Sequence, residues 1–432
     1  MNVRTRFAPS PTGFLHVGGL RTALYNYLLA RQQSGTYLLR IEDTDRERFV
    51  PGAVESLLRT FERVGLLPDE GPKLVDGQVV QSGDVGPYIQ SERLPIYAQH
   101  AKELVDAGAA YRCFCSSERL DGLRKQQEIA KLPTKYDRHC ASLPAAEVEQ
   151  RVSSGESHVI RLRVPDGETT FEDVVRGPIT ISNAEVDDQV LIKSDGFPTY
   201  HMAVVVDDHL MNVSHVIRGD EWISSTPKHV ILYRLFGWDA PKFAHLPLLL
   251  NPDKSKLSKR QGDVAVEDYL NKGYLPDALV NFVALLGFNP KSDQELYSVA
   301  ELIELFDLSK INKSGAVFDV AKLDWMNAQY IMKKTDAELV ALVAPFLTAA
   351  GKSVPSDLLG RICAIEKTRM VKLTDIVELV DGYLTLPAYE PTALVWKKAD
   401  AADGKAQLTG IKTLLEGLDA GAWSNVAVVE SA

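Results

Sequence analysis

The chain has 432 residues, of which 45% are hydrophobic and 25% are charged, and these proportions exclude a disordered or fibrous protein. A chain of this length exceeds what one hydrophobic core normally supports, so about two to four domains are expected. The net charge of −10 gives no general attraction to nucleic acid, although a local basic stripe is sufficient for binding.

Targeting and membrane segments are not expected. The sequence shows no apolar run long enough to span a bilayer, and residues 1–6 lead into a strand rather than an apolar signal core. The four cysteines are too few and too unevenly spaced for a disulfide framework. A cytoplasmic protein with no membrane partner is therefore expected.

The first 65 residues predict a β-α-β unit. A strand over 3–7 is followed by Leu20, Leu24 and Leu28 at helical spacing. Gly35 ends that helix, the apolar run 36–41 forms a second strand, and Pro51 opens another amphipathic helix. A helix between two short apolar strands predicts a parallel pair in a doubly wound sheet, whose ligands bind at the carboxyl ends of the strands.

The pattern changes over 87–190, where helices and short strands mix and predict an α+β insertion into that sheet. Parallel strands are expected to return at 190–193 and 202–206, followed by a helix over 226–236. From 264 onward helical patterns dominate. The end of the chain, 421–432, is expected to be the start of a helical bundle whose remaining helices are missing.

The segment 7–19, FAPSPTGFLHVGG, runs from a strand through a Pro/Gly turn into a helix. A helix start offers free backbone N–H groups and a positive dipole end, both of which suit a phosphate. Gly18 and Gly19 remove side chains where a nucleotide lies against the backbone. His16 is predicted to donate to the phosphate; the ordinary alternative is a histidine satisfied by neighbouring backbone groups.

A second segment, KLSKR at 256–260, places Lys256 and Lys259 in a loop after the turn residues at 251–253. Two lysines three residues apart suit the charge on a transferring phosphorus. The alternative is a pair of solvated loop charges.

Together the two segments resemble the HIGH and KMSKS elements of class I aminoacyl-tRNA synthetases, in the variants typical of the glutamyl enzymes. The resemblance implies an α/β fold: a doubly wound parallel nucleotide-binding sheet split by an α+β insertion and followed by an all-helical C-terminal region. It implies a monomer that binds ATP with Mg²⁺, L-glutamate and tRNA(Glu). The implied catalytic residues are His16, Lys256 and Lys259, and the ATP site adds Gly18, Gly19, Glu221 and Trp222.

The same resemblance divides the chain into four parts. They are a catalytic domain (1–86 and 191–263), an inserted acceptor-binding domain (87–190), a helical stem-contact domain (264–325) and a helical anticodon-binding region (326–432), whose completeness is left open.

Recognition of glutamate needs guanidinium groups for the carboxylates and an anion for the amine. The runs RIEDTDR at 40–46 and RGDEW at 218–222 match the glutamyl and glutaminyl subfamily closely. The alternative is an ordinary network of ion pairs at a sheet edge. The implied glutamate pocket consists of Arg6, Ser10, Glu42, Tyr200 and Arg218.

Three cysteines of the insertion, Cys113, Cys115 and Cys140, can occupy three corners of a tetrahedral zinc site. A structural zinc is expected there, and the fourth ligand is either Tyr136, as in some members of the family, or His139. The alternative is three reduced cysteines in a small domain.

The hypothesis that follows is a glutamate–tRNA ligase that forms glutamyl-adenylate and passes the acyl group to the 3' end of tRNA(Glu). The alternatives are glutaminyl specificity, a paralogue that glutamylates a tRNA base, and a non-catalytic tRNA-binding protein. Whether tRNA(Gln) is also charged is left open.

Overall fold

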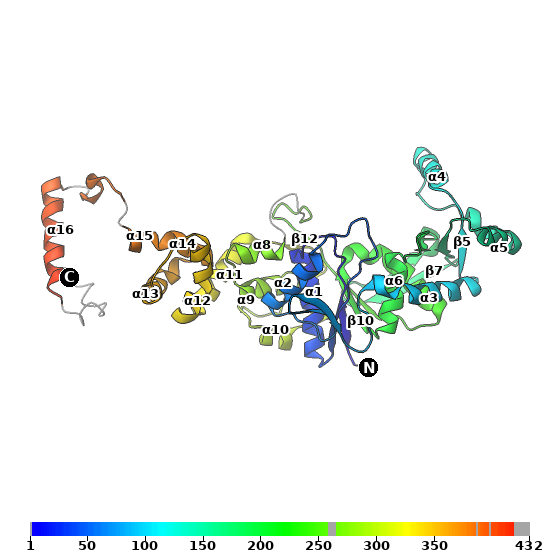
Figure 1. Ribbon diagram of the computed structural model, residues 1–432, viewed down its shortest axis with the longest axis horizontal. Helices are drawn as coiled ribbons and strands as arrows, with labels where there is room; N and C mark the ends of the chain where they lie inside the picture. Colours follow the sequence, from blue (N-terminus) through cyan, green and yellow to red (C-terminus); the bar gives the residue numbers. More distant parts are fainter. Residues whose placement is uncertain (1, 258–264, 386–387, 397–398, 419–432) are drawn as a thin grey trace. The chain divides into compact units, whose positions relative to one another are not determined.

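The computed structural model describes residues 2–257, 265–385, 388–396 and 399–418 (Figure 1). The chain forms two compact units. The first comprises Met1–Lys334 and Thr368–Thr374, and the second comprises Thr335–Lys367 and Asp375–Ala432.

A six-stranded sheet forms the centre of the first unit, with the strand order β2-β1-β10-β11-β7-β8. Strands β2 to β7 in this order run parallel, and β8 closes the edge as an antiparallel partner of β7. The bounds are β1 Arg4–Phe7, β2 Thr36–Leu39, β7 Glu168–Asp173, β8 Gly177–Ser182, β10 His215–Gly219 and β11 Lys242–Leu246. The predicted doubly wound parallel sheet is confirmed.

Successive side chains of these strands point to opposite faces of the sheet and contribute to two separate apolar layers. Leu38 of β2 and Val216 of β10 lie in one cluster, which also contains Val230 of helix α7 (Thr226–Phe236). The next residues, Leu39 and Ile217, lie in the other cluster, which packs against α1 (Val17–Gln32) and α2 (Ala53–Val64). Successive side chains of a strand point to opposite faces, so each strand supplies both layers.

The chain between β2 and β10 adds a hairpin and a second, three-stranded sheet. The hairpin is β3 (Gly71–Val75) with β4 (Gln78–Ser82), and the antiparallel sheet has the order β5-β6-β9. Strands β7 and β8, which fall inside the predicted insertion, belong to the central sheet instead. The remaining bounds are α3 Leu94–Asp106, β5 Ala110–Cys113, α4 Ser117–Ile129, α5 Ala145–Ser153, β6 Val159–Leu162 and β9 Val190–Ile192.

Two predictions of parallel strands in this region were wrong. The strand at 190–193 forms as β9, but it pairs antiparallel with β6 and not with the parallel sheet. The run 202–206 is part of helix α6 (Tyr200–Leu210), in which Met202–Asp208 are all buried. A short, wholly apolar run has neither strand nor helix periodicity, so its pattern does not distinguish a buried strand from a buried helix.

The rest of the described chain is mainly helical, as predicted. A two-stranded parallel pair, β12 (Leu249–Leu250) with β13 (Ala316–Val317), ties the helices to the end of β11. The helices of the first unit are α8 Val266–Asn271, α9 Pro276–Ala284, α10 Val299–Leu305 and α11 Val320–Lys333. Those of the second unit are α12 Asp336–Ala349, α13 Ser356–Glu366, α14 Ile376–Leu379, α15 Asp381–Leu384 and α16 Ala401–Glu416.

Candidate active site

A cavity of ≈ 1190 Å³ opens at the carboxyl ends of β1, β2 and β10. This is the edge at which open parallel sheets bind their ligands. All the predicted ATP and glutamate residues that the structure describes line it, and Lys259 lies outside the described residues. The predicted residues on the cavity wall are Arg6, Ser10, His16, Gly18, Gly19, Glu42, Tyr200, Arg218, Glu221, Trp222 and Lys256.

His16 is the N-cap of α1, and its Nδ1 accepts a hydrogen bond of 3.0 Å from the backbone N–H of Gly19. His16 therefore makes the backbone contact that is the ordinary alternative to a role at a phosphate. It does not remove His16 from the cavity, because an imidazole that accepts at Nδ1 carries its proton at Nε2 when neutral. One N–H of the helix start is used by this cap, and so fewer remain for a phosphate than the sequence indicates.

Two glycines leave room for side chains at this helix start. A Cβ on Gly18 would lie 3.1 Å from Nδ1 and Cε1 of His16, and one on Gly19 would lie 2.8 Å from a methyl carbon of Leu15. Gly18 thus gives room to the His16 ring as well as to any ligand in the cavity.

The described ends of the lysine loop are attached beside the same helix start. Leu257 donates its N–H to the carbonyl of Leu249 at 2.9 Å, and Val266 donates its N–H to the carbonyl of Leu15 at 2.8 Å. Lys256 is exposed on the cavity wall. The loop therefore leaves and rejoins the described structure next to His16.

One wall of the cavity rests on a buried set of ion pairs, which we call the charged network: Arg6, Arg40, Glu42 and Asp208. Arg6 donates to both carboxylate oxygens of Asp208, at 3.0 and 3.2 Å. Arg40, which is fully buried, donates to Asp208 at 2.8 Å and to Glu42 at 3.0 Å. Burial raises the pKa of Asp208, but Arg6 and Arg40 outweigh burial and hold this pKa below its usual range. For Glu42 burial prevails over Arg40 and Arg6, and its pKa is raised.

The adjacent strand β10 holds Arg218 in a set of uncharged acceptors, which we call the neutral cage: Tyr200, Thr226, His229 and His245. The guanidinium donates to Tyr200 Oη at 3.0 Å, Thr226 Oγ1 at 2.8 Å, His229 Nδ1 at 3.2 Å and His245 Nε2 at 3.1 Å. Among the described residues no carboxylate forms an ion pair with Arg218. The cavity therefore presents a buried cation whose charge is not neutralised by contact.

The remaining predicted residues lie around the cage. The ring of Trp222 packs on that of Tyr200 with centroids 4.4 Å apart. Glu221 folds over Gly219, where a Cβ would come within 2.1 Å of its carboxylate. Ser10 is exposed in the turn after β1.

Several residues that contact the predicted ones were missed. Asp208, Thr226, His229 and His245 are polar groups with at most 3% exposure that hold Arg6 or Arg218. The only sequence signal for Asp208 is a pair of carboxylates directly after an apolar run, a pattern that predicts the end of a strand. The two histidines carry no motif, because their role depends on residues that are 11 and 27 positions from Arg218.

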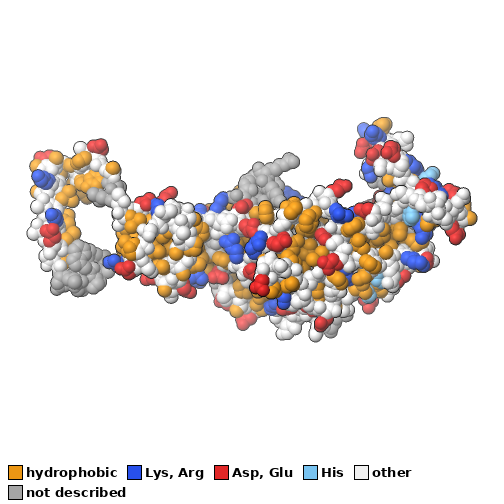
Figure 2. Space-filling view, viewed as in Figure 1, with side chains coloured by type: hydrophobic (Ala, Val, Ile, Leu, Met, Phe, Trp, Pro, Cys, Tyr) orange, Lys and Arg blue, Asp and Glu red, His pale blue; other side chains and the backbone are white. Residues whose placement is uncertain are grey.

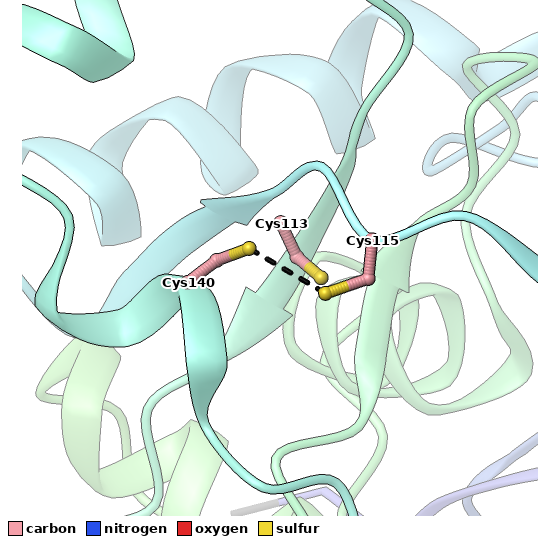
Figure 3. Close-up of side chains that lie close together, drawn as sticks. All are labelled: Cys113, Cys115 and Cys140. Atoms are coloured by element: carbon pink, nitrogen blue, oxygen red, sulfur yellow. Dashed lines mark hydrogen bonds between the residues drawn. The ribbon is translucent and has the colours of Figure 1, made fainter. Parts of the chain in front are cut away.

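The three insertion cysteines come together at the end of β5, whose last residue is Cys113 (Figure 3). Their Sγ atoms lie within 4.8 Å of one another, and those of Cys115 and Cys140 are 3.6 Å apart. Tyr136 Oη lies 3.2 Å from Cys113 Sγ and 3.4 Å from Cys115 Sγ, whereas His139 is exposed. Zn–S bonds of about 2.3 Å in a tetrahedron place sulfur atoms about 3.8 Å apart. The cluster is therefore compatible with zinc.

The surface shows no strong separation of charge on the face in Figure 2, where acidic and basic side chains are interspersed. None of the helices in the described part of the chain has the length and apolar character needed to cross a membrane.

Comparisons with known proteins agree with this geometry. The family described as class I tRNA synthetases (E and Q), catalytic domain, matches residues 2–325, and an anticodon binding domain matches residues 338–431. The glutamate–tRNA ligase of Alkaliphilus metalliredigens is 53% identical over 397 residues, which cover 90% of this chain and 80% of the relative. That of Clostridioides difficile is 56% identical over 353 residues, which cover 81% and 72%.

Among solved structures, a glutamate tRNA ligase from Elizabethkingia meningosepticum, in complex with its amino acid, matches with a TM-score of 0.87 and 36% identity. The match covers 97% of this chain and 87% of that one. The resemblance inferred from the two motifs is confirmed, and the chain belongs to the class I tRNA synthetases of the glutamate and glutamine group.

Proposed function

We propose that this protein is a glutamate–tRNA ligase. It joins L-glutamate to ATP, which enters as its Mg²⁺ complex, and then transfers the glutamyl group to the 3' end of tRNA(Glu). The relatives named as glutamate–tRNA ligases support this proposal over most of the chain. The observation that carries it is Arg218, a cation on the cavity wall that no described carboxylate contacts.

The glutamate pocket is assigned to Arg6, Ser10, Glu42, Tyr200 and Arg218. Arg218 pairs with the side-chain carboxylate, because its charge is not already neutralised by a contact. Glu42 supplies the anion for the amine, and Arg6, held by Asp208, completes the wall. A charge-assisted pair in a buried site is strong, and an uncharged carboxamide leaves the cation without its partner.

The first step needs no protein nucleophile. A carboxylate oxygen of glutamate attacks the α-phosphorus, the bond to the leaving oxygen breaks, and pyrophosphate departs. His16, Lys256 and Lys259 act by position and charge, with Gly18, Gly19, Glu221 and Trp222 around the nucleotide. In the second step a ribose hydroxyl of tRNA attacks the glutamyl carbonyl, and AMP leaves.

The cysteine cluster is assigned to one structural zinc held by Cys113, Cys115, Cys140 and Tyr136. The exposed position of His139 favours Tyr136 as the fourth ligand. A purified sample should contain about one equivalent of zinc by elemental analysis. Cys140→Ser should lose the metal, lower the unfolding temperature and reduce tRNA charging more than adenylate formation. Metal-free protein with full charging activity would leave three reduced cysteines as the correct interpretation.

Further proposals follow from the family. We assign the acceptor end of tRNA to the insertion and the anticodon to the C-terminal helices, and we retain the predicted four-part division as a proposal. The β7–β8 hairpin is the exception, since it joins the catalytic sheet. A cytoplasmic location and a monomeric state are proposed on the same basis.

The test of the function is ATP–pyrophosphate exchange with glutamate or glutamine, each with and without tRNA. Glutamate-dependent exchange followed by charging of tRNA(Glu) is expected. Exchange with glutamine alone would indicate the glutaminyl enzyme. Exchange with glutamate without charging of a terminal ribose would indicate a base-modifying paralogue, and no exchange under any condition would indicate a non-catalytic protein.

A further inference from the structure

The hydrogen bonds around Arg218 determine the protonation of its neighbours. A guanidinium has five N–H donors and no acceptor, so every contact it makes must be accepted by the partner. Arg218 uses its Nε–H, both N–H groups of Nη1 and one of Nη2. One Nη2–H has no partner among the described residues and remains for a ligand in the cavity.

The acceptor at His245 is prepared by Asp173, at the end of β7. The Nε2 of His245 accepts from Arg218, so its proton must be at Nδ1, which lies 2.6 Å from an oxygen of Asp173. Asp173 also accepts N–H bonds from Val175 and Arg176. Burial acts to raise the pKa of Asp173, but the hydrogen bonds from His245 and the backbone hold this pKa below its usual range. The carboxylate thus selects the tautomer of His245.

The acceptor at His229 is prepared by a second histidine. Its Nδ1 accepts from Arg218, so its proton lies at Nε2, which is 3.0 Å from His201 Nδ1. Burial and the neighbouring Lys228 lower the pKa of His201 to about 3. Burial and Arg218 lower the pKa of His229 well below its usual value. Both rings are therefore neutral near pH 7, and neither competes with Arg218 for an anion.

We propose that Asp173 with His245, and His201 with His229, are positioning residues that hold Arg218 by uncharged acceptors, so that its charge is available to the carboxylate of the substrate. The inference rests on the proposed function, which supplies that carboxylate. Asp173 does not contact Arg218 directly. It is hydrogen-bonded to His245, which in turn accepts from Arg218. A carboxylate in direct contact would neutralise the cation and remove the reason to prefer glutamate over glutamine.

The first experiment compares two replacements of His229. His229→Asn keeps an acceptor where Nδ1 was, and His229→Asp puts a carboxylate there. In ATP–pyrophosphate exchange, the ratio of kcat/KM for glutamate to that for glutamine should fall by roughly 100-fold in His229→Asp. The ratio for His229→Asn should stay within about tenfold of the wild-type ratio, because a change in one neutral hydrogen bond costs less free energy than a new carboxylate beside Arg218. Equal ratios in the two variants would overturn the proposal.

The second experiment acts through the tautomer. Asp173→Asn presents an amide N–H to His245 Nδ1, which moves the imidazole proton to Nε2. The Nε2–H then faces the Nε–H of Arg218, and the hydrogen bond between the two residues is lost. A carboxylate-to-amide change beside a histidine has this effect on the tautomer in other proteins. KM for glutamate should rise about tenfold or more while KM for ATP changes less than about threefold. A parallel rise in both constants would indicate a general structural defect and contradict the positioning role.

A third experiment uses the unaltered protein, so its result depends neither on whether a variant folds nor on which substrate the protein uses. The chain has nine histidines, so ¹⁵N labelling of histidine allows the tautomers to be assigned by NMR. We expect His245 to be protonated at Nδ1 and His229 at Nε2. A charged imidazolium or the opposite tautomer at either residue would overturn the cage even if glutamate exchange is normal. Absence of glutamate exchange with the expected tautomers would instead overturn the proposed function.

Discussion

Two arginines border the same cavity and are held in opposite ways. Arg6 is bound by both oxygens of Asp208 within the charged network, whereas Arg218 contacts two hydroxyl groups and two imidazoles in the neutral cage. Both side chains are nearly buried, at 3% and 5% exposure. The difference lies in the partner and not in the burial: Asp208 neutralises the charge of Arg6, whereas no carboxylate among the described residues pairs with Arg218.

The charged network should dominate stability. Asp208→Asn removes the counter-ion shared by Arg6 and Arg40 and should lower the free energy of unfolding by about 3–5 kcal/mol, the cost of breaking a buried ion pair from one side. Urea unfolding followed by circular dichroism measures this. Arg218→Gln serves as the matched variant and should cost clearly less, because it removes a buried cation along with its hydrogen bonds. A larger loss of unfolding free energy in Arg218→Gln than in Asp208→Asn would show that the charged network is not the main contributor to stability.

The lysine loop should act on the nucleotide and leave both arginine sites unchanged. Lys259→Ala should reduce adenylate formation by about 2–4 kcal/mol of transition-state stabilisation, the scale of one preorganised donor. Glutamate binding without ATP, measured by calorimetry, and the preference for glutamate over glutamine should both be retained. A rate of exchange within a factor of a few of the wild type would show that the loop has been assigned wrongly.

His201, which supports the cage through His229, should leave a signature in the pH dependence of stability. The pKa of His201 is lowered by burial from 6.5 to about 3, so the unfolded chain binds a proton that the folded chain does not. The stabilisation is therefore complete above pH 6.5 and is lost as the pH falls towards 3. Between neutral pH and pH 5.5 the loss should be about 1 kcal/mol, and His201→Asn should remove this part of the slope. Identical slopes in urea unfolding would show that His201 is not held neutral.

The sequence predicts the framework of the cavity well and its supporting contacts poorly. The strands and helices at 3–41 follow from apolar spacing and turn residues, and Arg6, His16 and Arg218 follow from motifs that lie at strand or helix ends. The run at 202–206 was misassigned because five apolar residues have no periodicity. The other cage members were missed because Thr226 and His229 come from α7 and His245 from β11, and the tautomers that make the histidines acceptors exist only in the folded structure.

The sequence also predicts more freedom at the helix start than the structure has. Gly18 and Gly19 were interpreted as room for a nucleotide, and the structure shows that the ring of His16 occupies part of that room. The glycines therefore leave room both for the cavity and for the ring of the capping histidine.

We propose that Arg218, and not Arg6, decides between a carboxylate and a carboxamide on the amino-acid side chain. The most direct test is the ratio of kcat/KM for glutamate to that for glutamine in pyrophosphate exchange, compared between the wild type and Arg218→Gln. The ratio should collapse, because glutamate loses its charged partner while glutamine loses comparatively little. Equal losses for both amino acids would place Arg218 on the shared α-carboxylate or on ATP and would transfer the specificity role to Arg6.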